Sequence, residues 1–307
     1  MVQKTLTLQK IKNMSQYQLL VLDLDGTLTN SQKIITPKTL KALFRAQESG
    51  VKIVLASGRP TYGIEPIAKQ LKLKQYGGYI LSYNGGQIID YKTGEILYQQ
   101  SVPQNEIPHL YEFAKRHNLA IMSYDGNDIV TENPDDQYVI IEANINNMPV
   151  RGVKSFLATI QHPVTKCLIV GEPTKLAEVE KVAKQEFGET INLFTSAPYF
   201  LECVPPGIDK ALSIDRLIKK LNMTKDNVVA CGDGYNDLSM IQFAGLGVAM
   251  GNAQSGVIDA ADFVTLSNDE DGVAYVINNY IFHKNKLRRM CSRDYWKIKW
   301  QNRKRKN

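Results

Sequence analysis

Two acidic side chains, spaced two residues apart, close an apolar run near the start of the sequence. The run is L-L-V-L at residues 19–22, and Asp23 and Asp25 follow it within V-L-D-L-D-G-T-L-T-N at residues 21–30. An isolated charge is costly to bury unless a partner compensates it. The two acids therefore either lie in water at the end of a strand, or they hold a cation and take part in chemistry.

Two other apolar runs also end in polar residues. The run at 51–56 is followed by Ser57 and Gly58, and the run at 227–231 leads into G-D-G-Y-N-D with Asp233, Asn236 and Asp237. Oxygen ligands without clustered His or Cys favour Mg²⁺. With the ammonium of Lys210, this set is suited to a phosphoryl group, whose spread negative charge requires a metal, cations and close backbone amides.

The pairing of two carboxylates at D-L-D allows each a separate task. A carboxylate is a competent nucleophile that forms an aspartyl phosphate, which water then hydrolyses. A second acid protonates the leaving oxygen and later activates the water. The acids are then compensated by the metal and the phosphate, which explains their place at the end of a buried strand.

The elements that must position these groups alternate between strands and helices. L-L-V-L does not alternate in polarity, which predicts a strand buried on both faces. Helices are predicted at residues 37–49, 61–72 (with Pro66 as a break) and 209–221, so the fold class is α/β with a Rossmann-like parallel sheet. In such sheets ligands bind beyond the carboxyl ends of the strands, which brings the polar groups to one edge.

The pattern changes between residues 101 and 196, where no predicted strand ends in paired acids. In this block we expect helices at 106–117, 150–160 and 175–187 and strands at 120–123, 138–142, 166–170 and 191–194. This change of pattern separates residues 101–196 from residues 16–100 and 197–282. Residues 1–15 are expected to be a loose leader and residues 283–307 a basic tail.

Charge is distributed unevenly along the 307 residues, whose net charge is +6. Residues 284–307 hold eleven Lys or Arg and one acid, so this segment carries +10 and the other 283 residues carry −4. Aromatic residues are interleaved with its cations, which suits nucleic acid or an anionic membrane surface, although a solvated terminus is the simpler interpretation.

The four cysteines, at 167, 203, 231 and 291, lack metal-site spacing, and no apolar stretch approaches the 18 residues of a membrane helix. Reduced thiols and a cytoplasmic protein without membrane partners are expected. The chain has no G-x-x-x-x-G-K-[ST] motif, and Asp237 replaces the third glycine of a G-x-G-x-x-G dinucleotide motif. D-L-D-G-T-L also departs from a calcium-binding loop, because its glycine comes too early.

Four motifs resemble, in order, those of the haloacid dehalogenase superfamily. They are D-L-D-G-T (23–27), A-S-G-R-P (56–60), Lys210 and G-D-G-Y-N-D (232–237). N-G-G (84–86), G-V-A-M-G-N-A (247–253) and D-E-D-G-V-A (269–274) are similar to segments of its Cof-type phosphatases. The resemblance covers about residues 16–282.

The resemblance implies a role for each matched residue. Asp23 would be the nucleophile and Asp25 the general acid and base. Mg²⁺ would be held by Asp23, the backbone carbonyl of Asp25, Asp233 and Asp237. The phosphate would contact the backbone of Leu24 together with Ser57, Gly58, Lys210 and Asn236. The block at 101–196 would be an inserted α+β unit, the type IIB α/β cap that selects the leaving group, within a discontinuous core at residues 16–100 and 197–282.

The expected function is therefore a Mg²⁺-dependent phosphatase of small phosphorylated metabolites, with sugar phosphates leading and phosphorylated cofactors such as pyridoxal phosphate or flavin precursors next. A sugar phosphomutase of the same superfamily is an alternative enzyme. A phospho-aspartyl signalling module is a non-enzymatic alternative, but it lacks so long an insertion. Nucleic-acid binding through residues 284–307 is another.

Overall fold

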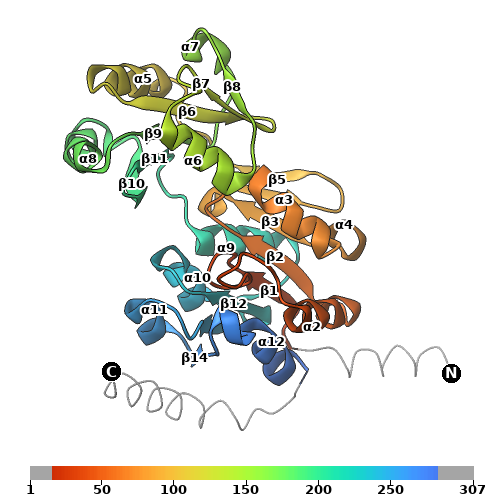
Figure 1. The fold of residues 1–307 in the computed structure, drawn as a ribbon. Helices are drawn as coiled ribbons and strands as arrows, with labels where there is room; N and C mark the ends of the chain where they lie inside the picture. Colours follow the sequence, from red (N-terminus) through yellow and green to blue (C-terminus); the bar gives the residue numbers. More distant parts are fainter. Residues whose placement is uncertain (1–15, 283–307) are drawn as a thin grey trace, which may run out of the picture.

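The structure is a computed structural model that describes residues 16–282, and these residues form two β-sheets with helices packed on their faces (Figure 1). The larger sheet has eight strands in the order β14-β13-β12-β1-β2-β3-β4-β5. Their bounds are β1 Leu19–Leu22, β2 Lys52–Ala56, β3 Tyr79–Ser82, β4 Gln87–Asp90, β5 Ile96–Gln99, β12 Val228–Gly232, β13 Leu246–Ala249 and β14 Phe263–Val264. All neighbouring pairs from β14 to β3 are parallel, and β4 and β5 add an antiparallel edge.

Strand β1 is buried on both faces of this sheet, as its continuous apolar run predicts. Leu20 and Leu22 join one core cluster, whereas Leu19 and Val21 join the cluster on the other face, because successive side chains of a strand point to opposite sides. The helices that complete the two clusters are α2 Pro37–Glu48, α3 Thr61–Gln70, α4 Leu73–Tyr76 and α12 Gly272–Val276 on the first face, and α9 Lys210–Lys220, α10 Leu238–Phe243 and α11 Ser255–Ala260 on the second.

The smaller sheet has six strands in the order β10-β11-β9-β6-β7-β8. Their bounds are β6 Ala120–Asp125, β7 Asp128–Thr131, β8 Val150–Gly152, β9 Cys167–Val170, β10 Asn192–Ala197 and β11 Phe200–Val204. Helices α5 Glu106–Arg116, α7 Phe156–Thr159 and α8 Pro173–Phe187 pack on one face, and α6 Gln137–Asn146 packs on the other. Only the β7–β8 pair is parallel among these described strands.

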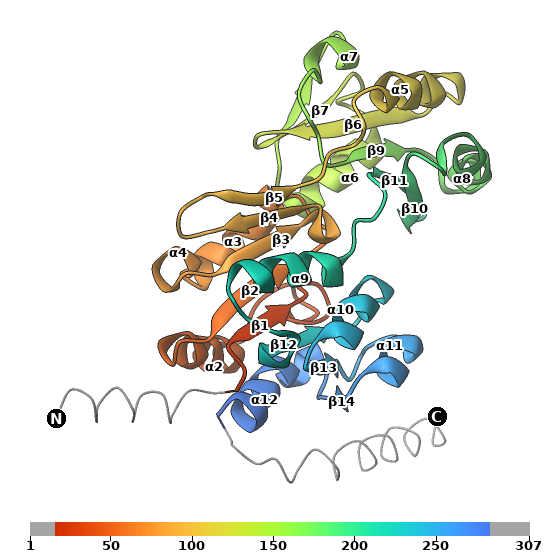
Figure 2. The same cartoon turned by 180° about the vertical axis from the view of Figure 1, so that it is seen from behind.

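The chain enters the smaller sheet after β5 and returns to the larger one after β11, at helix α9. In both views the smaller sheet lies beyond the edge strands β4 and β5 (Figure 2). Short helical turns complete the described chain: η1 Tyr83–Gly85, η2 Lys225–Asn227, η3 Tyr235–Asp237, η4 Asn268–Glu270 and η5 Ile277–Ile281. Within residues 16–282, none of the helices has both the length and the apolar character that crossing a bilayer demands.

The α/β fold class with a parallel core sheet is confirmed, but three local predictions are wrong. Residues 138–142 are helical, in α6, because the Asp136 side chain accepts hydrogen bonds from Tyr138 N and Val139 N and so caps a helix there. Residues 150–160 are not one helix, because β8 pairs with β7, a strand not predicted. Pro66 lies inside α3 and does not end it.

The boundary expected at residues 196 and 197 also needs correction. It falls in the hairpin of β10 and β11, and β11 pairs with β9 in the smaller sheet, so residues 200–204 do not join the larger sheet. We propose that the inserted unit runs from about residue 101 to residue 204. The leader at 1–15 and the basic tail at 283–307 lie outside the described residues.

Candidate active site

Three carboxylates from two neighbouring strand ends gather at the carboxyl edge of the larger sheet. Asp23 follows β1 and Asp233 follows β12, and these strands pair in parallel, with Leu22 opposite Cys231. Asp237 belongs to the turn η3 just beyond β12. One oxygen of each carboxylate lies within 4.8 Å of the others, a spacing that suits a bound cation.

The ammonium of Lys210 lies against this group of acids and is fully buried. It comes from the first residue of α9, and its Nζ donates to Asp23 Oδ1 at 2.8 Å, to Asp237 Oδ1 at 2.6 Å and to the backbone oxygen of Ala56 at 2.9 Å. Asp209 caps the same helix by accepting from Leu212 N, which fixes where α9 begins. The position of Lys210 is therefore determined both by its helix and by three acceptors.

Burial and mutual repulsion perturb the charges of the acids. Desolvation and the neighbouring Asp237 raise the pKa of Asp23 to about 8, against the opposing effect of Lys210. Desolvation also raises the pKa of Asp233 to about 6. Burial alone would lower the pKa of Lys210, but Asp23 and Asp237 raise it above its usual value. The site carries more negative charge than one lysine compensates, which favours a cation.

The loops around the acids hold them at close quarters. Asp237 Oδ2 accepts from the backbone N of Asp233 and of Gly234, both at 3.0 Å, so its carboxylate also orders the loop after β12. Thr27 donates to Asp233 Oδ1 at 2.9 Å. Gly26 has a φ of +84°, and a Cβ there would lie 2.3 Å from Asp233 Oδ2, so this position requires glycine.

Asp25 lies at the same rim but outside the group of three acids. Its carboxylate accepts two hydrogen bonds of 2.8 Å from the guanidinium of Arg59 and one of 2.8 Å from Lys33 Nζ. Burial by itself would raise the pKa of Asp25, but the hydrogen bonds from Arg59 and Lys33 hold it below its usual value. In this arrangement Asp25 is an ionised partner of Arg59.

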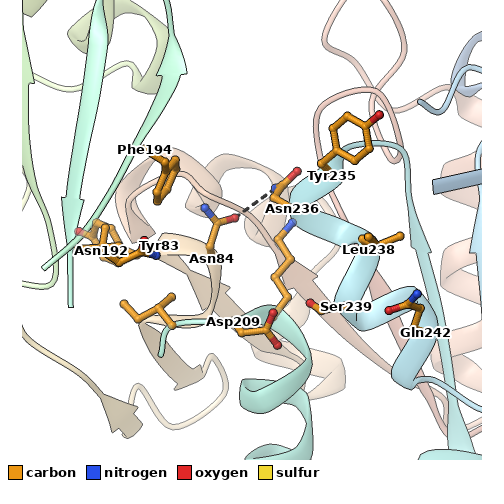
Figure 3. A pocket seen from close by; sticks show the side chains of 13 residues that line it. Tyr83, Asn84, Asn192, Phe194, Asp209, Tyr235, Asn236, Leu238, Ser239 and Gln242 are labelled. Carbon is orange, nitrogen blue, oxygen red and sulfur yellow. Dashed lines mark hydrogen bonds between the residues drawn. The ribbon is translucent and has the colours of Figure 1, made fainter. Parts of the chain in front are cut away.

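The remaining predicted residues line the same rim. Ser57 is buried, and its Oγ accepts from Arg59 N at 3.2 Å. Figure 3 shows Asn84 and Asn236 pointing toward one another, with Asn236 Nδ2 donating to Asn84 Oδ1 at 3.2 Å. A Cβ on Gly58 would lie 3.1 Å from Asn84 Nδ2, so glycine lets these loops approach closely.

The structure thus brings eight of the nine predicted residues to one cavity or its edge. Asp23, Asp25, Ser57, Gly58, Asp233 and Asn236 line a cavity of about 620 Å³, and Lys210 and Asp237 lie directly behind Asp23. The side chain of Leu24 is buried in the core, and its backbone oxygen accepts from Thr29 N at 2.9 Å.

Several residues of the cavity were not predicted. Arg59 and Asn84 belong to the A-S-G-R-P and N-G-G segments, and both line the cavity. Glu142, Lys166 and Glu202, from the smaller sheet and α6, also line the cavity. The sequence contains one sign of these residues. Glu202 interrupts the otherwise apolar F-L-E-C-V strand, and a charge buried there needs a partner.

Comparisons with known proteins agree with this geometry. A family model described as haloacid dehalogenase-like hydrolase matches residues 20–277. A curated Bacillus subtilis protein, 5-amino-6-(5-phospho-D-ribitylamino)uracil phosphatase YcsE, is 29% identical over 269 residues, which cover 86% of this chain and 96% of that protein.

Solved structures share the fold over most of the described chain. A haloacid dehalogenase-like hydrolase from Bacteroides thetaiotaomicron has a TM-score of 0.83 and 55% identity, covering 85% of this chain and 98% of its own. The sugar phosphatase BT4131, described as subclass IIB, has a TM-score of 0.73 and 26% identity, covering 87% of this chain and 100% of its own. The chain therefore belongs to the haloacid dehalogenase-like hydrolases, as a Cof-type member of that family.

Proposed function

We propose that this protein is a Mg²⁺-dependent phosphatase that hydrolyses small phosphomonoesters through an aspartyl-phosphate intermediate on Asp23. The observation that carries the proposal is the meeting of Asp23, Asp233 and Asp237 within 4.8 Å of one another, with Lys210 at 2.8 Å from Asp23. Sugar phosphates are the leading substrate class, because a structural relative is named a sugar phosphatase. Phosphorylated cofactor precursors are the second class, in view of the ribitylaminouracil phosphatase.

The acid group fits a divalent cation by its chemistry. Its donors are carboxylate oxygens, which suit Mg²⁺. The pKa values of Asp23 and Asp233 are raised first by burial and then by repulsion from Asp237, and a bound cation offsets both effects. Asp23 and Asp233 would hold the ion, together with the backbone oxygen of Asp25, and Asp237 would support them. Bound Mg²⁺ supplies electrostatic stabilisation of negative charge on the transferring phosphoryl group.

The proposed chemistry has two steps. A carboxylate oxygen of Asp23 attacks phosphorus, the bond from phosphorus to the ester oxygen breaks, and that oxygen takes a proton from Asp25. Water then attacks the phosphoryl group as Asp25 accepts a proton, which releases inorganic phosphate and restores Asp23. Lys210 orients the attacking carboxylate through its hydrogen bond to Oδ1.

Asp25 must change partners to act as an acid. In the described arrangement its two oxygens accept from Arg59 and Lys33. A carboxylate held by a bidentate guanidinium is a poor proton donor, because both cations favour its ionised form. We therefore infer that the Arg59 contact opens when Asp25 receives the proton that it delivers to the ester oxygen.

The phosphate oxygens would be bound by groups on the loops that follow the strands. Ser57 supplies a hydroxyl, Gly58 and Leu24 supply backbone amides, and Asn236 supplies an amide side chain. Lys210 supplies positive charge from behind Asp23. These donors surround the negative charge that spreads over the phosphoryl oxygens during transfer.

A comparison of two aspartate variants tests the proposal. With p-nitrophenyl phosphate and Mg²⁺, we expect the wild type to release phosphate and Asp23→Asn to lose turnover by at least about 10³-fold, because the amide is not a nucleophile. Asp215→Asn is the matched control, since Asp215 pairs only with Lys219 on the exposed face of α9 among its described ion pairs. Retained turnover in Asp23→Asn would refute the nucleophile, and turnover undiminished by a chelator would refute the metal.

A further inference from the structure

The cavity at the acid group is lined on its other side by residues of the smaller sheet and of helix α6. The same space of about 620 Å³ is lined by Asp23 and Asp233 and by Glu142, Lys166 and Glu202. A cavity of this size suits a small molecule. A phosphate at Asp23 therefore leaves the rest of the ester facing these charged residues.

Glu142, Lys166 and Glu202 form a buried ionic group, called here the Glu–Lys–Glu cluster. Lys166 Nζ lies 3.0 Å from Glu202 Oε2 and 3.8 Å from Glu142 Oε1. The side chains of Lys166, Glu142 and Glu202 are only 4%, 7% and 12% exposed. Lys166 immediately precedes β9, Glu202 is on the adjacent strand β11, and Glu142 comes from α6.

Neighbouring hydroxyl groups fix the two carboxylates of the cluster. Tyr124 Oη donates to Glu142 Oε1 at 2.5 Å, and Ser196 Oγ donates to Glu202 Oε1 at 2.8 Å. Burial raises the pKa of Glu142, although Lys166 and Tyr124 oppose this effect. A buried ion pair adds little net stability compared with apolar side chains, so its position beside a cavity calls for another explanation.

Asn146 supplies an independent sign of a missing partner. It lies one turn beyond Glu142 on α6, is 3% exposed and lines the same cavity. Its Nδ2 donates to the backbone oxygen of Glu142 at 3.0 Å, whereas its Oδ1 has no hydrogen-bond partner within residues 16–282. This oxygen lies against Gly63 of α3, 2.7 Å from where a Cβ on Gly63 would stand. A rotation of the Asn146 side chain toward the cavity would let a bound hydroxyl group supply the donor that the amide oxygen lacks.

We propose that the Glu–Lys–Glu cluster and Asn146 bind hydroxyl groups of the leaving group, so that the substrate is the phosphate ester of a sugar or polyol. A hydroxyl group both donates and accepts, which matches carboxylate and amide oxygens placed beside an ammonium. Two glutamates and one lysine disfavour a carboxylated leaving group by repulsion. This inference rests on the proposed phosphatase function and adds the residues that select its substrate.

The first test needs only the wild-type protein and matched phosphates. Hexitol 6-phosphate and n-hexyl phosphate share a six-carbon chain, but only the first carries hydroxyl groups. We expect kcat/KM to be at least about tenfold higher for the hexitol ester, because hydrogen bonds to charged groups change affinity by about tenfold or more. Glucose 6-phosphate, assayed beside them, separates recognition of a sugar ring from that of an open chain.

The second test asks whether the cluster causes this preference. In Glu142→Gln and Glu202→Gln we expect the ratio of kcat/KM between the hexitol and hexyl esters to fall about tenfold. Glu132→Gln is the matched control, because Glu132 also accepts from a tyrosine hydroxyl, that of Tyr111, but does not line the cavity. Its ratio should equal that of the wild type.

The outcomes separate this inference from the function on which it rests. Hydrolysis of both esters at equal kcat/KM by the wild type would overturn the inference and leave the phosphatase intact. A wild-type preference that survives in both cluster variants would also overturn it. If the wild type hydrolyses no phosphate ester, including p-nitrophenyl phosphate, the proposed function itself fails. Circular dichroism of each variant confirms that the compared proteins are folded. The comparison of the two esters with the wild-type protein needs no variant and tests the inference by itself.

Discussion

Replacing Lys210 by methionine removes the only described cation within hydrogen-bond reach of Asp23 and Asp237, and it leaves an unbranched apolar side chain that is one atom shorter. In the wild type, Lys210 Nζ has three acceptors at 2.6–2.9 Å, and the side chain is fully buried. Lys210→Met leaves two buried carboxylates facing one another. We expect the variant to be less stable and to lose phosphatase turnover, because the nucleophile loses its orienting partner.

The size of the stability loss follows from the burial of the pair. Removing one partner of a buried ion pair costs about 3–5 kcal/mol, because the remaining charge has no compensation. Lys219→Met, on the same helix α9, is the matched control. Lys219 forms an exposed i,i+4 pair with Asp215, and such pairs contribute only about 0.3–0.5 kcal/mol.

Urea unfolding, followed by circular dichroism, measures the stability losses of Lys210→Met and Lys219→Met. A chelator is present so that no metal cation replaces the missing ammonium. The double variant Lys210→Met/Asp237→Asn should recover about 1–3 kcal/mol relative to the sum of the single changes, because one unpaired charge is also removed. A loss below about 1 kcal/mol for Lys210→Met, or strict additivity in the double variant, would refute the view that these groups are coupled and desolvated.

Three further predictions concern other parts of the described chain. Gly26→Ala should reduce Mg²⁺-dependent turnover strongly, because the new Cβ would collide with Asp233. Gly94→Ala is the control: Gly94 has a similar φ of +79° but no atom within 4 Å of the added Cβ, so this variant should lose only about 1 kcal/mol of unfolding free energy. Equal losses of turnover in the two variants would disprove the collision at Gly26. Asp136→Ala should cost about 1 kcal/mol in urea unfolding, because α6 loses its N-terminal cap, and no change would argue against that cap. Burial raises the pKa of Cys231 to about 12, so at pH 8 only about one thiol in 10⁴ is ionised. In a Cys291→Ser background, a disulfide reagent should therefore react with the native protein only after denaturant is added, and rapid reaction of the native protein would contradict this burial.

Local sequence signals explain why the catalytic edge could be predicted. A continuous apolar strand followed by D-L-D, and another followed by G-D-G-Y-N-D, each carry their chemistry within a few residues. Parallel strands bring their carboxyl ends to one edge, so proximity of Asp23 and Asp233 followed from the predicted sheet alone. The same reasoning failed at residues 138–142, where a short apolar run fits either periodicity and the Asp136 cap decided for a helix.

Other features depend on contacts between residues far apart in the chain. No local pattern indicates that Arg59 pairs with Asp25, because the two residues lie 34 positions apart and only the arrangement of the loops brings them together. The hairpin of β10 and β11 belongs to the smaller sheet because β11 pairs with β9, and no local sequence pattern indicates this pairing.

The sequence by itself determined the class of sheet, the acids at its edge and the kind of chemistry they favour, because these depend on neighbours along the chain. Only the tertiary structure decided what faces those acids across the cavity. Glu142 comes from helix α6, Lys166 from the residue before β9 and Glu202 from strand β11, and the three share no motif. Their charges become meaningful only when folding buries them together, since a solvated lysine or glutamate at any of these positions would look the same in the sequence.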